Sequence, residues 1–265
     1  MVKESVQIYD LEGKSVRRVR LPGVFHSSVR SDLIKRAVLS VQSGRYQPQG
    51  RDPAAGERTT AASLGVGHGV SRVPRVKGRG SSSSGKGALA GMTVGGRTAH
   101  PPRAEKRIVK SINMKERRRA IRSAVAATAD EQLVASRGHL IEGVLNFPLV
   151  VVDEIQGLEK SSEVKKVFLQ LGLWGDVERV KSGIKVRAGR GKTRGRRLKG
   201  GRGPLVVIGE DRGIVRAARN IPGVSVALVR NLNAEQLAPG THLGRLTLWS
   251  ESAFKGLSSL HGEEV

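Results

Sequence analysis

The chain has 265 residues, of which 47 are Lys or Arg and 23 are Asp or Glu, giving a formal net charge of +24 and an isoelectric point near 11.4. A positive excess of this size is typical of proteins that bind nucleic acid and disfavours a neutral enzyme. Cysteine is absent, which excludes disulfide bonds and cysteine-bound zinc, and the 3% of aromatic residues disfavours base stacking on aromatic side chains.

Nothing in the sequence predicts export or a membrane span. The N-terminal segment MVKESVQIYDLEGKSV has no apolar signal core. The longest apolar run, VLNFPLVVV, is interrupted by Asn146 and Pro148 and is far shorter than the ~20 residues that cross a bilayer. We therefore expect a cytoplasmic protein.

A β-hairpin and a helix are predicted at the N-terminus. Alternation with a period of two predicts strands over residues 5–9 and 14–20, joined by the turn DLEGK. Ser31 suits an N-cap, and Gly44 suits the end of the helix that follows. The apolar residues with helical spacing are Leu33, Ile34, Ala37, Val38 and Val41.

Residues 42–103 show no sustained periodicity and are predicted to form one long extended loop. Prolines interrupt the segment at 48, 53, 74, 101 and 102, and its only acidic residues are Asp52 and Glu57. Ordering ~60 residues costs on the order of 60–120 kcal/mol of backbone entropy, which the few apolar side chains of this loop cannot offset. We expect the loop to become ordered against a large polyanion.

One part of this loop, GSSSSGKG at 80–87, approaches the phosphate-binding motif of nucleotide hydrolases, G-x-x-x-x-G-K-[ST]. Gly87 stands where the motif needs a hydroxyl to hold magnesium. Pro74 disfavours a strand before the segment, and glycines at 91, 95 and 96 disfavour a helix after it. A hydrolase is an alternative, and a flexible basic loop is the favoured interpretation.

Regular structure is predicted again after residue 103. An amphipathic helix, or a bent pair of helices, is predicted over 104–130. Buried strands are predicted over 148–154, 203–211 and 223–230, and helices over 160–171, 213–220, 233–238 and 251–260. This pattern predicts an α/β fold: a Rossmann-like three-layer domain with a mostly parallel sheet, built from residues 1–41 and 104–265, with the loop 42–103 inserted near the N-terminus.

A second basic loop is predicted over 185–203, where KVRAGRGKTRGRRLKGGRG contains nine basic residues and no acid. Its GKT at 191–193 is not a phosphate-binding motif, because Val186 occupies the position of the first glycine. Both loops and the first part of the helix after residue 103 are rich in Arg, whose planar guanidinium suits phosphate. Together these three segments predict an RNA-binding surface.

Candidate catalytic and metal-binding residues are few, and neither an enzyme nor a cofactor or metal is expected. The histidines at 26, 68, 100, 139, 242 and 261 lack the spacing of metal ligands. His100 is interpreted as a packing or RNA-contact residue. Asp153 and Glu154 end a predicted parallel strand, where α/β enzymes bind ligands. An acid–base role for them is the alternative to an exposed strand end or helix cap.

Four stretches resemble the archaeal and eukaryotic branch of the family of large-ribosomal-subunit protein four. They are GVSRVPRVKGRG (69–80), GRTAHPPRAEKRIVKSINMKERRRAIRSAVAATAD (96–130), KVRAGRGKTRGRR (185–197) followed by GPLVVIGED, and LAPGTHLGRLTLWSESAF (237–254). The resemblance implies an α/β domain on the solvent side of the large subunit and a loop that threads through the rRNA to line the polypeptide exit tunnel. The chain stops without the basic C-terminal extension of eukaryotic members, so we expect an archaeal source.

Charge and the resemblance together define the candidate site residues. The residues predicted to bind rRNA are Arg45, Arg51, Arg58, Arg72, Arg75, Lys77, Arg79, Lys86, Arg97, His100, Arg103, Lys106, Arg107, Lys110, Arg117, Arg118, Arg119, Arg187, Arg190, Lys192, Arg194, Arg196 and Arg197. The loop tip that the resemblance places at the tunnel is Val70, Arg72, Val73, Pro74, Arg75, Lys77 and Gly78. Residues 81–91 are smaller and more polar than the bulky sequence the family implies there.

The leading hypothesis is a structural constituent of the large ribosomal subunit in the cytoplasm. Its expected partners are large-subunit rRNA, other large-subunit proteins and the nascent polypeptide, and it would join the subunit early in assembly. The alternative is a free-standing protein that condenses nucleic acid or acts as an RNA chaperone. Indifference among rRNA, unrelated RNA and DNA would favour that alternative.

Overall fold

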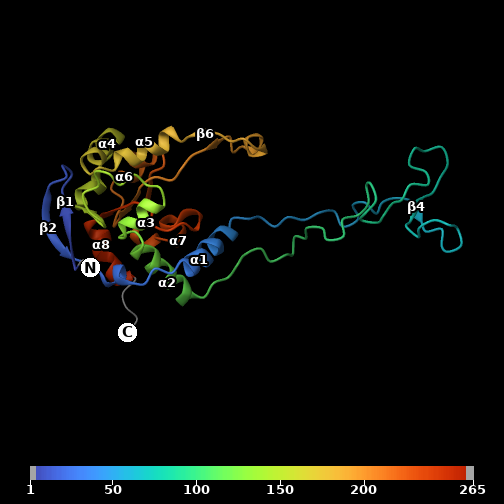
Figure 1. Ribbon diagram of the computed structural model, residues 1–265, viewed down its shortest axis with the longest axis horizontal. Coiled ribbons are helices and arrows are strands. Elements are labelled where there is room, and N and C mark those ends of the chain that lie inside the picture. Colours follow the sequence, from blue (N-terminus) through green and yellow to red (C-terminus); the bar gives the residue numbers. More distant parts are fainter. Residues whose placement is uncertain (1–3, 261–265) are drawn as a thin grey trace. The chain divides into compact units, whose positions relative to one another are not determined.

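The computed structural model describes residues 4–260, and the chain divides into two units (Figure 1). The first, the α/β unit, comprises residues 1–42 and 111–265. The second, the arm, comprises Ser43–Lys110. No helix in the described residues is both long enough and apolar enough to cross a membrane.

The α/β unit is built on a six-stranded, mostly parallel sheet, which confirms the predicted α/β class. The strand order is β2 (Ser15–Arg20), β1 (Ser5–Tyr9), β5 (Leu149–Val151), β10 (Thr247–Ser250), β8 (Leu205–Ile208) and β9 (Ser225–Leu228). Only β1 and β2 pair antiparallel, and Gly13 in their turn has a φ of +83°. β10, which was not predicted, lies between β5 and β8, an order that differs from the 3-2-1-4-5-6 of dinucleotide-binding sheets.

Both faces of the sheet are covered, because successive side chains of each buried strand enter different apolar clusters. Val150 and Trp249 belong to one cluster, and Leu149, Val151 and Leu248 belong to the other. Helices α1 (Ser31–Ser43), α2 (Met114–Ala126), α7 (Ala234–Leu237) and α8 (Glu251–Leu260) supply the first cluster, and α3 (Glu131–Ser136), α4 (Ser161–Gln170), α5 (Trp174–Ser182) and α6 (Ile214–Arg219) supply the second.

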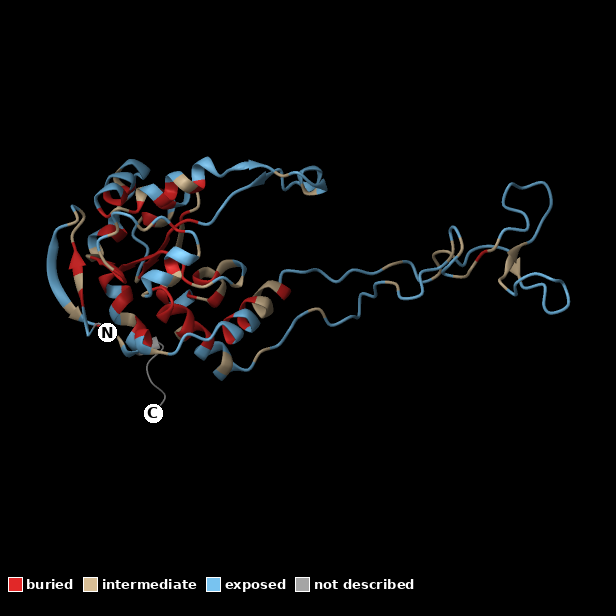
Figure 2. Cartoon of the chain, in the orientation of Figure 1, coloured by how far each residue is buried: buried red, intermediate tan, exposed pale blue. Residues whose placement is uncertain are grey.

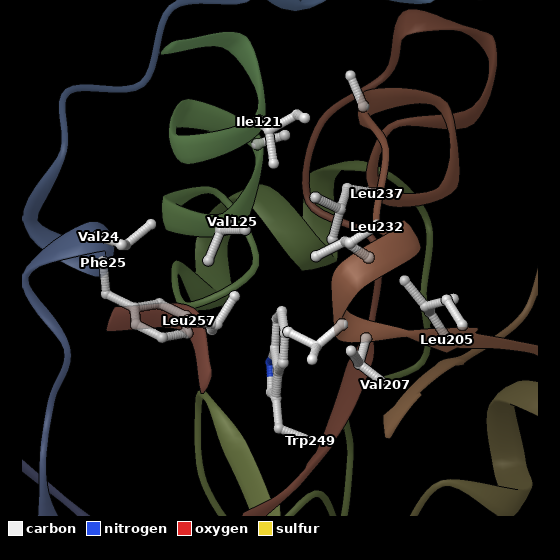
Figure 3. Packing of buried hydrophobic residues seen from close by; sticks show 14 of the residues in the cluster. Val24, Phe25, Ile121, Val125, Leu205, Val207, Leu232, Leu237, Trp249 and Leu257 are labelled. Atoms are coloured by element: carbon white, nitrogen blue, oxygen red, sulfur yellow. The ribbon is translucent and has the colours of Figure 1, made fainter. Parts of the chain in front are cut away.

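The centre of the first cluster is the fully buried Trp249 in β10 (Figure 3). Phe25 meets the indole edge-on at a centroid distance of 5.8 Å and stacks on Phe254 of α8 at 5.3 Å. Leu257 lies in the same cluster, one turn further along α8. These contacts hold α8 against the sheet.

The helices over 31–43, 161–170, 214–219, 234–237 and 251–260 confirm the predicted ones, whereas α3 and α5 were not predicted. The prediction of a helix over 104–130 is wrong in its first third, because α2 begins only at Met114 and Asn113 before it is extended. The backbone N–H of Lys110 instead donates to the Ser43 hydroxyl at 2.9 Å. A side-chain bond across the base of the arm therefore replaces the first helical turns.

The arm contains little regular structure and almost no interior (Figure 2). Its only strands are β3 (Ala61–Ala62) and β4 (Arg75–Val76), which pair antiparallel. Among residues 43–110 only Ser43 and Ala88 are buried. The arm thus lacks an apolar core of its own, as its composition predicts.

Candidate nucleic-acid interface

The predicted rRNA-binding side chains lie on the arm, on α2 and on the second basic loop. All of them are exposed except Arg51, Arg75 and Arg187, which are half-buried. These three arginines are also the ones whose guanidinium groups bind carbonyl oxygens of their own loops. Partial burial of these three arginines thus accompanies a structural role within their own loops.

Arg51 joins the two limbs of the arm. Its guanidinium donates to the Thr98 hydroxyl on the returning limb and to the Ala55 carbonyl at 3.2 Å. Close by, a Cβ on Gly56 would lie 2.6 Å from the backbone of Gly96, and Gly56 has a φ of +82°. Only glycine lets the two limbs approach this closely.

Two acidic residues of the arm, Asp52 and Glu57, neutralise part of its charge where the two limbs approach each other. Asp52 forms an ion pair with Arg58, and that hydrogen bond, followed by one from the Ala54 N–H, lowers the pKa of the carboxyl. Glu57 lies 3.8 Å from Arg97. A cavity of about 160 Å³ lies where the two limbs approach, and both basic and acidic side chains line it. The arm's cations without an acidic partner among residues 43–110 include Arg72, Lys77, Arg79 and Lys86.

The predicted tip is anchored by backbone bonds around Arg75 and Val76. Val76 accepts from Gly85 at 3.1 Å and donates to Lys86 at 3.0 Å, while the Arg75 guanidinium donates to the Gly85 carbonyl at 3.0 Å. Lys77 donates its backbone N–H to Thr60 at 2.7 Å. The segment that contains the tip therefore has defined local geometry.

The GSSSSGKG segment does not have the surroundings of a phosphate-binding loop. Residues 80–87 form a turn, and the next helix in the chain is α2, which begins at Met114. A nucleotide-hydrolase loop needs a helix directly after it, because the helix N-terminus supplies the amides that hold phosphate. The hydrolase alternative is wrong on this geometry.

The first half of α2 carries a cationic surface. Arg117, Arg118 and Arg119 are exposed, whereas the residues that follow, from Ala120 to Ala126, are buried apart from Arg122. Glu116 pairs with Arg36 of α1 at 3.0 Å. The apolar part of α2 thus fixes the helix to the α/β unit and leaves the arginine run in solvent.

The second basic loop is an ordered hairpin. β6 (Lys185–Val186) pairs antiparallel with β7 (Leu198–Lys199), and a short 3-10 helix, Arg190–Arg194, forms the end of the hairpin. Arg187 donates its Nε to the Arg196 carbonyl at 3.1 Å, which closes the hairpin. The exposed cations that this hairpin presents are Arg190, Lys192, Arg194, Arg196 and Arg197.

A buried carboxylate that the sequence did not point to lies beneath the hairpin. Asp176 is fully buried and accepts hydrogen bonds from His139 Nδ1 at 2.9 Å, from the Leu140 N–H at 3.1 Å and from Arg179 Nε at 2.8 Å. Burial alone raises the pKa of Asp176, but the bonds from His139 and Arg179 outweigh it, and the pKa is lowered. Arg179 also donates to the Arg202 carbonyl at 3.1 Å.

Arg245, also missed from the sequence, holds the same end of the hairpin. This residue is 2% exposed, and burial lowers its pKa to about 9. Its guanidinium donates to the carbonyls of Gly203 at 3.0 Å and Gln236 at 2.8 Å and to the Ser225 hydroxyl at 2.9 Å. Buried arginines of this kind are found only through contacts between residues distant in the chain, so no local pattern identifies them.

Asp153 and Glu154 were predicted to end a strand, but β5 ends at Val151, both residues lie in a short 3-10 helix, Asp153–Gly157, and the bonds of Asp153 fit a helix cap. Asp153 accepts from the Ser252 N–H at 2.9 Å and hydroxyl at 2.7 Å, in the first turn of α8, and from Gln156 at 2.7 Å. Glu154 is exposed. In residues 4–260 no group of three His, Cys, Asp or Glu side chains could hold a metal ion.

Comparison with known proteins assigns the chain to a family. The sequence pattern of the ribosomal protein L4/L1 family matches residues 19–260. Proteins named large ribosomal subunit protein uL4 are 50% identical in Methanopyrus kandleri, over 97% of this chain and 98% of the relative, and 52% identical in Methanothrix thermoacetophila, over 96% and 98%. The relative from Methanosphaera stadtmanae is 48% identical over 96% of both chains. With its basic loops and its mostly parallel sheet, the chain belongs to the ribosomal protein L4/L1 family.

Proposed function

We propose that this chain is a non-enzymatic, structural constituent of the large ribosomal subunit that binds large-subunit rRNA. The observation that carries the proposal is its similarity, at about 50% identity over nearly the whole chain, to proteins named for that subunit. The exposed cations of the arm, of α2 and of the hairpin 185–199 supply the chemistry, since Arg and Lys bind phosphates and release their counterions.

The arm is proposed to order on rRNA, to support early assembly and to line the exit tunnel with its tip, residues 70–78. Its two buried residues cannot offset the entropy of ordering 68 residues, Ser43–Lys110, so a polyanion has to supply the contacts. The finer fold description, a Rossmann-like three-layer domain with the arm as an insertion, is likewise a proposal, supported by apolar clusters on both faces of the sheet.

Salt-dependent binding tests the rRNA proposal. The intact chain and a variant lacking residues 45–102 are titrated with large-subunit rRNA, an unrelated RNA and duplex DNA. The intact chain should prefer the rRNA and lose ~10³ to 10⁵-fold in affinity between about 50 and 200 mM salt if it neutralises ~6 to 10 phosphates. The variant should retain the preference at lower affinity, because the α/β unit has its own core. Equal binding of all three ligands would favour the nucleic-acid-condensing alternative.

The tunnel role needs a separate experiment in assembled subunits. A photo-crosslinking side chain at Val70 should label a stalled nascent polypeptide, because the proposed tip faces the tunnel. The same group at Val16, an exposed residue of β2, serves as the control and should not label the nascent chain. Labelling from Val16 alone would contradict the placement of the tip.

A further inference from the structure

The outer edge of β2 carries unpaired backbone groups. β2 is the terminal strand of the sheet and pairs only with β1 among the described residues. The Leu21 N–H, directly after β2, donates to the Glu4 carbonyl at 2.9 Å and so points toward β1. Because these directions alternate along an antiparallel strand, the N–H and C=O of Arg18 and Arg20 point to the open edge.

A groove of about 1140 Å³ lies at the C-terminal end of β2. Arg18 and Arg20 line it from one face of the strand, and Val19, whose side chain points to the opposite face, lines it as well. Glu4 and Ser5, at the start of the paired strand β1, line it too, so the groove lies at this end of the strand pair and reaches the open edge at Arg18 and Arg20. Phe254 and Lys255 of α8 are also among the lining residues, so the groove offers both apolar and basic groups beside the end of the strand.

The groove is basic. Glu4 is the only acid that lines it, against Arg18, Arg20 and Lys255. Lys255 is already paired with Glu251 at 2.7 Å, whereas Arg18 and Arg20 make no ion pair within residues 4–260. The two arginines are two residues apart on one face, about 7 Å, which is the spacing of alternate side chains on a neighbouring strand.

We propose that the β2 edge binds an extended acidic segment of a neighbouring protein, which adds a seventh strand to the sheet. Arg18 and Arg20 would pair with carboxylates at alternate positions of the segment, while their backbone groups form the ladder. The inference goes beyond the proposed function, which concerns rRNA and the exit tunnel and assigns no protein-binding surface. A peptide occupant is favoured over RNA because RNA has no peptide backbone that could continue the β-ladder.

Two substitutions at position 18 distinguish the contribution of the arginine charge to peptide binding from that of the backbone hydrogen bonds. Arg18→Gln removes the guanidinium and keeps the outward N–H, whereas Arg18→Pro removes both and is tolerated because that N–H does not pair with β1. The probe is a fluorescent peptide in which Glu and Val alternate, titrated into the full chain at about 0.15 M salt. A peptide of the same composition with the residues in blocks is the control for attraction to the basic arm.

The alternating peptide should bind more tightly than the block peptide. Arg18→Gln should raise the Kd of the alternating peptide about threefold to fivefold, and Arg18→Pro should raise it a further threefold to tenfold. The circular dichroism spectra of both variants should match that of the native chain. In hydrogen exchange the peptide should protect residues 15–20. Equal affinity for the two peptides, or an equal loss of affinity for the alternating peptide in the two variants, would overturn the proposal. Equal loss of rRNA affinity in both variants would identify RNA as the occupant. Preference for large-subunit rRNA through the arm does not depend on any of these results.

Discussion

The buried carboxylate beneath the basic hairpin allows a quantitative test by the substitution Asp176→Asn. The substitution keeps the shape of the side chain and removes its charge, so the bonds from His139 and Arg179 lose their charge assistance. Breaking a buried ion pair costs about 3–5 kcal/mol. We expect about 3 kcal/mol, the lower end, because the Arg179 side chain is 31% exposed and can turn toward water.

For a chain of this size, that loss corresponds to a fall in Tm of about 6–12 °C. Thermal unfolding of the full chain at about pH 7, followed by far-ultraviolet circular dichroism, measures it. Glu178→Gln is the matched control: it removes an exposed charge from the same helix and keeps an acceptor for the Trp174 indole N–H. A Tm for Asp176→Asn equal to that of the control would refute the assigned role of the buried network.

Three further predictions follow from the same structure. The pKa of Asp176 is lower in the folded chain than in the unfolded chain, where it is ~3.9. The charged carboxylate therefore stabilises the fold above that pH, and this stabilisation is lost as the pH falls through the folded-state pKa. Acid titrations should show a steeper loss of unfolding free energy below about pH 4 in the native chain than in Asp176→Asn. Gly244→Ala should cost more than about 2 kcal/mol in denaturant unfolding, since its Cβ would lie 2.5 Å from the Leu133 backbone. Gly240→Ala has a similar φ, and its Cβ would only make an ordinary contact with the His242 ring at 3.6 Å, so it should cost only ~1–2 kcal/mol. Arg194→Gln should reduce the slope of log affinity for rRNA against log salt by about 0.7–0.9, and an unchanged slope would place this side chain away from phosphate.

The elements predicted correctly from the sequence are those whose local pattern agrees with their final environment. β5, β8 and β9 are runs of β-branched and aliphatic residues, and α8 has apolar residues at helical spacing. β10 was missed although it is central, because Thr247 and Ser250 dilute its apolar character. Their burial depends on neighbours 40 or more residues away in the chain, such as Leu205 beside Thr247 and Val151 beside Ser250.

For the candidate site, composition predicts which side chains could bind phosphate, and contacts within the fold decide which of them are used to hold the protein's own loops. Arg51, Arg75 and Arg187 resemble the other arginines in sequence, yet they bind carbonyl oxygens of their own loops. The network of Asp176 and Arg245 was missed because its members come from separate helices and strands. The start of α2 was mispredicted because the bond from Lys110 to Ser43 ties two segments 67 residues apart.

The near absence of buried side chains in the arm has a consequence for how this protein is studied. Heat absorbed on unfolding comes from the loss of packed interior, and almost all of that interior lies in the α/β unit. Calorimetry and melting curves therefore do not register the arm, and a substitution such as Arg72→Glu would pass a stability screen unchanged while altering what the arm can bind. Thermal methods therefore describe the α/β unit and miss changes in the arm, so the arm has to be followed by binding measurements.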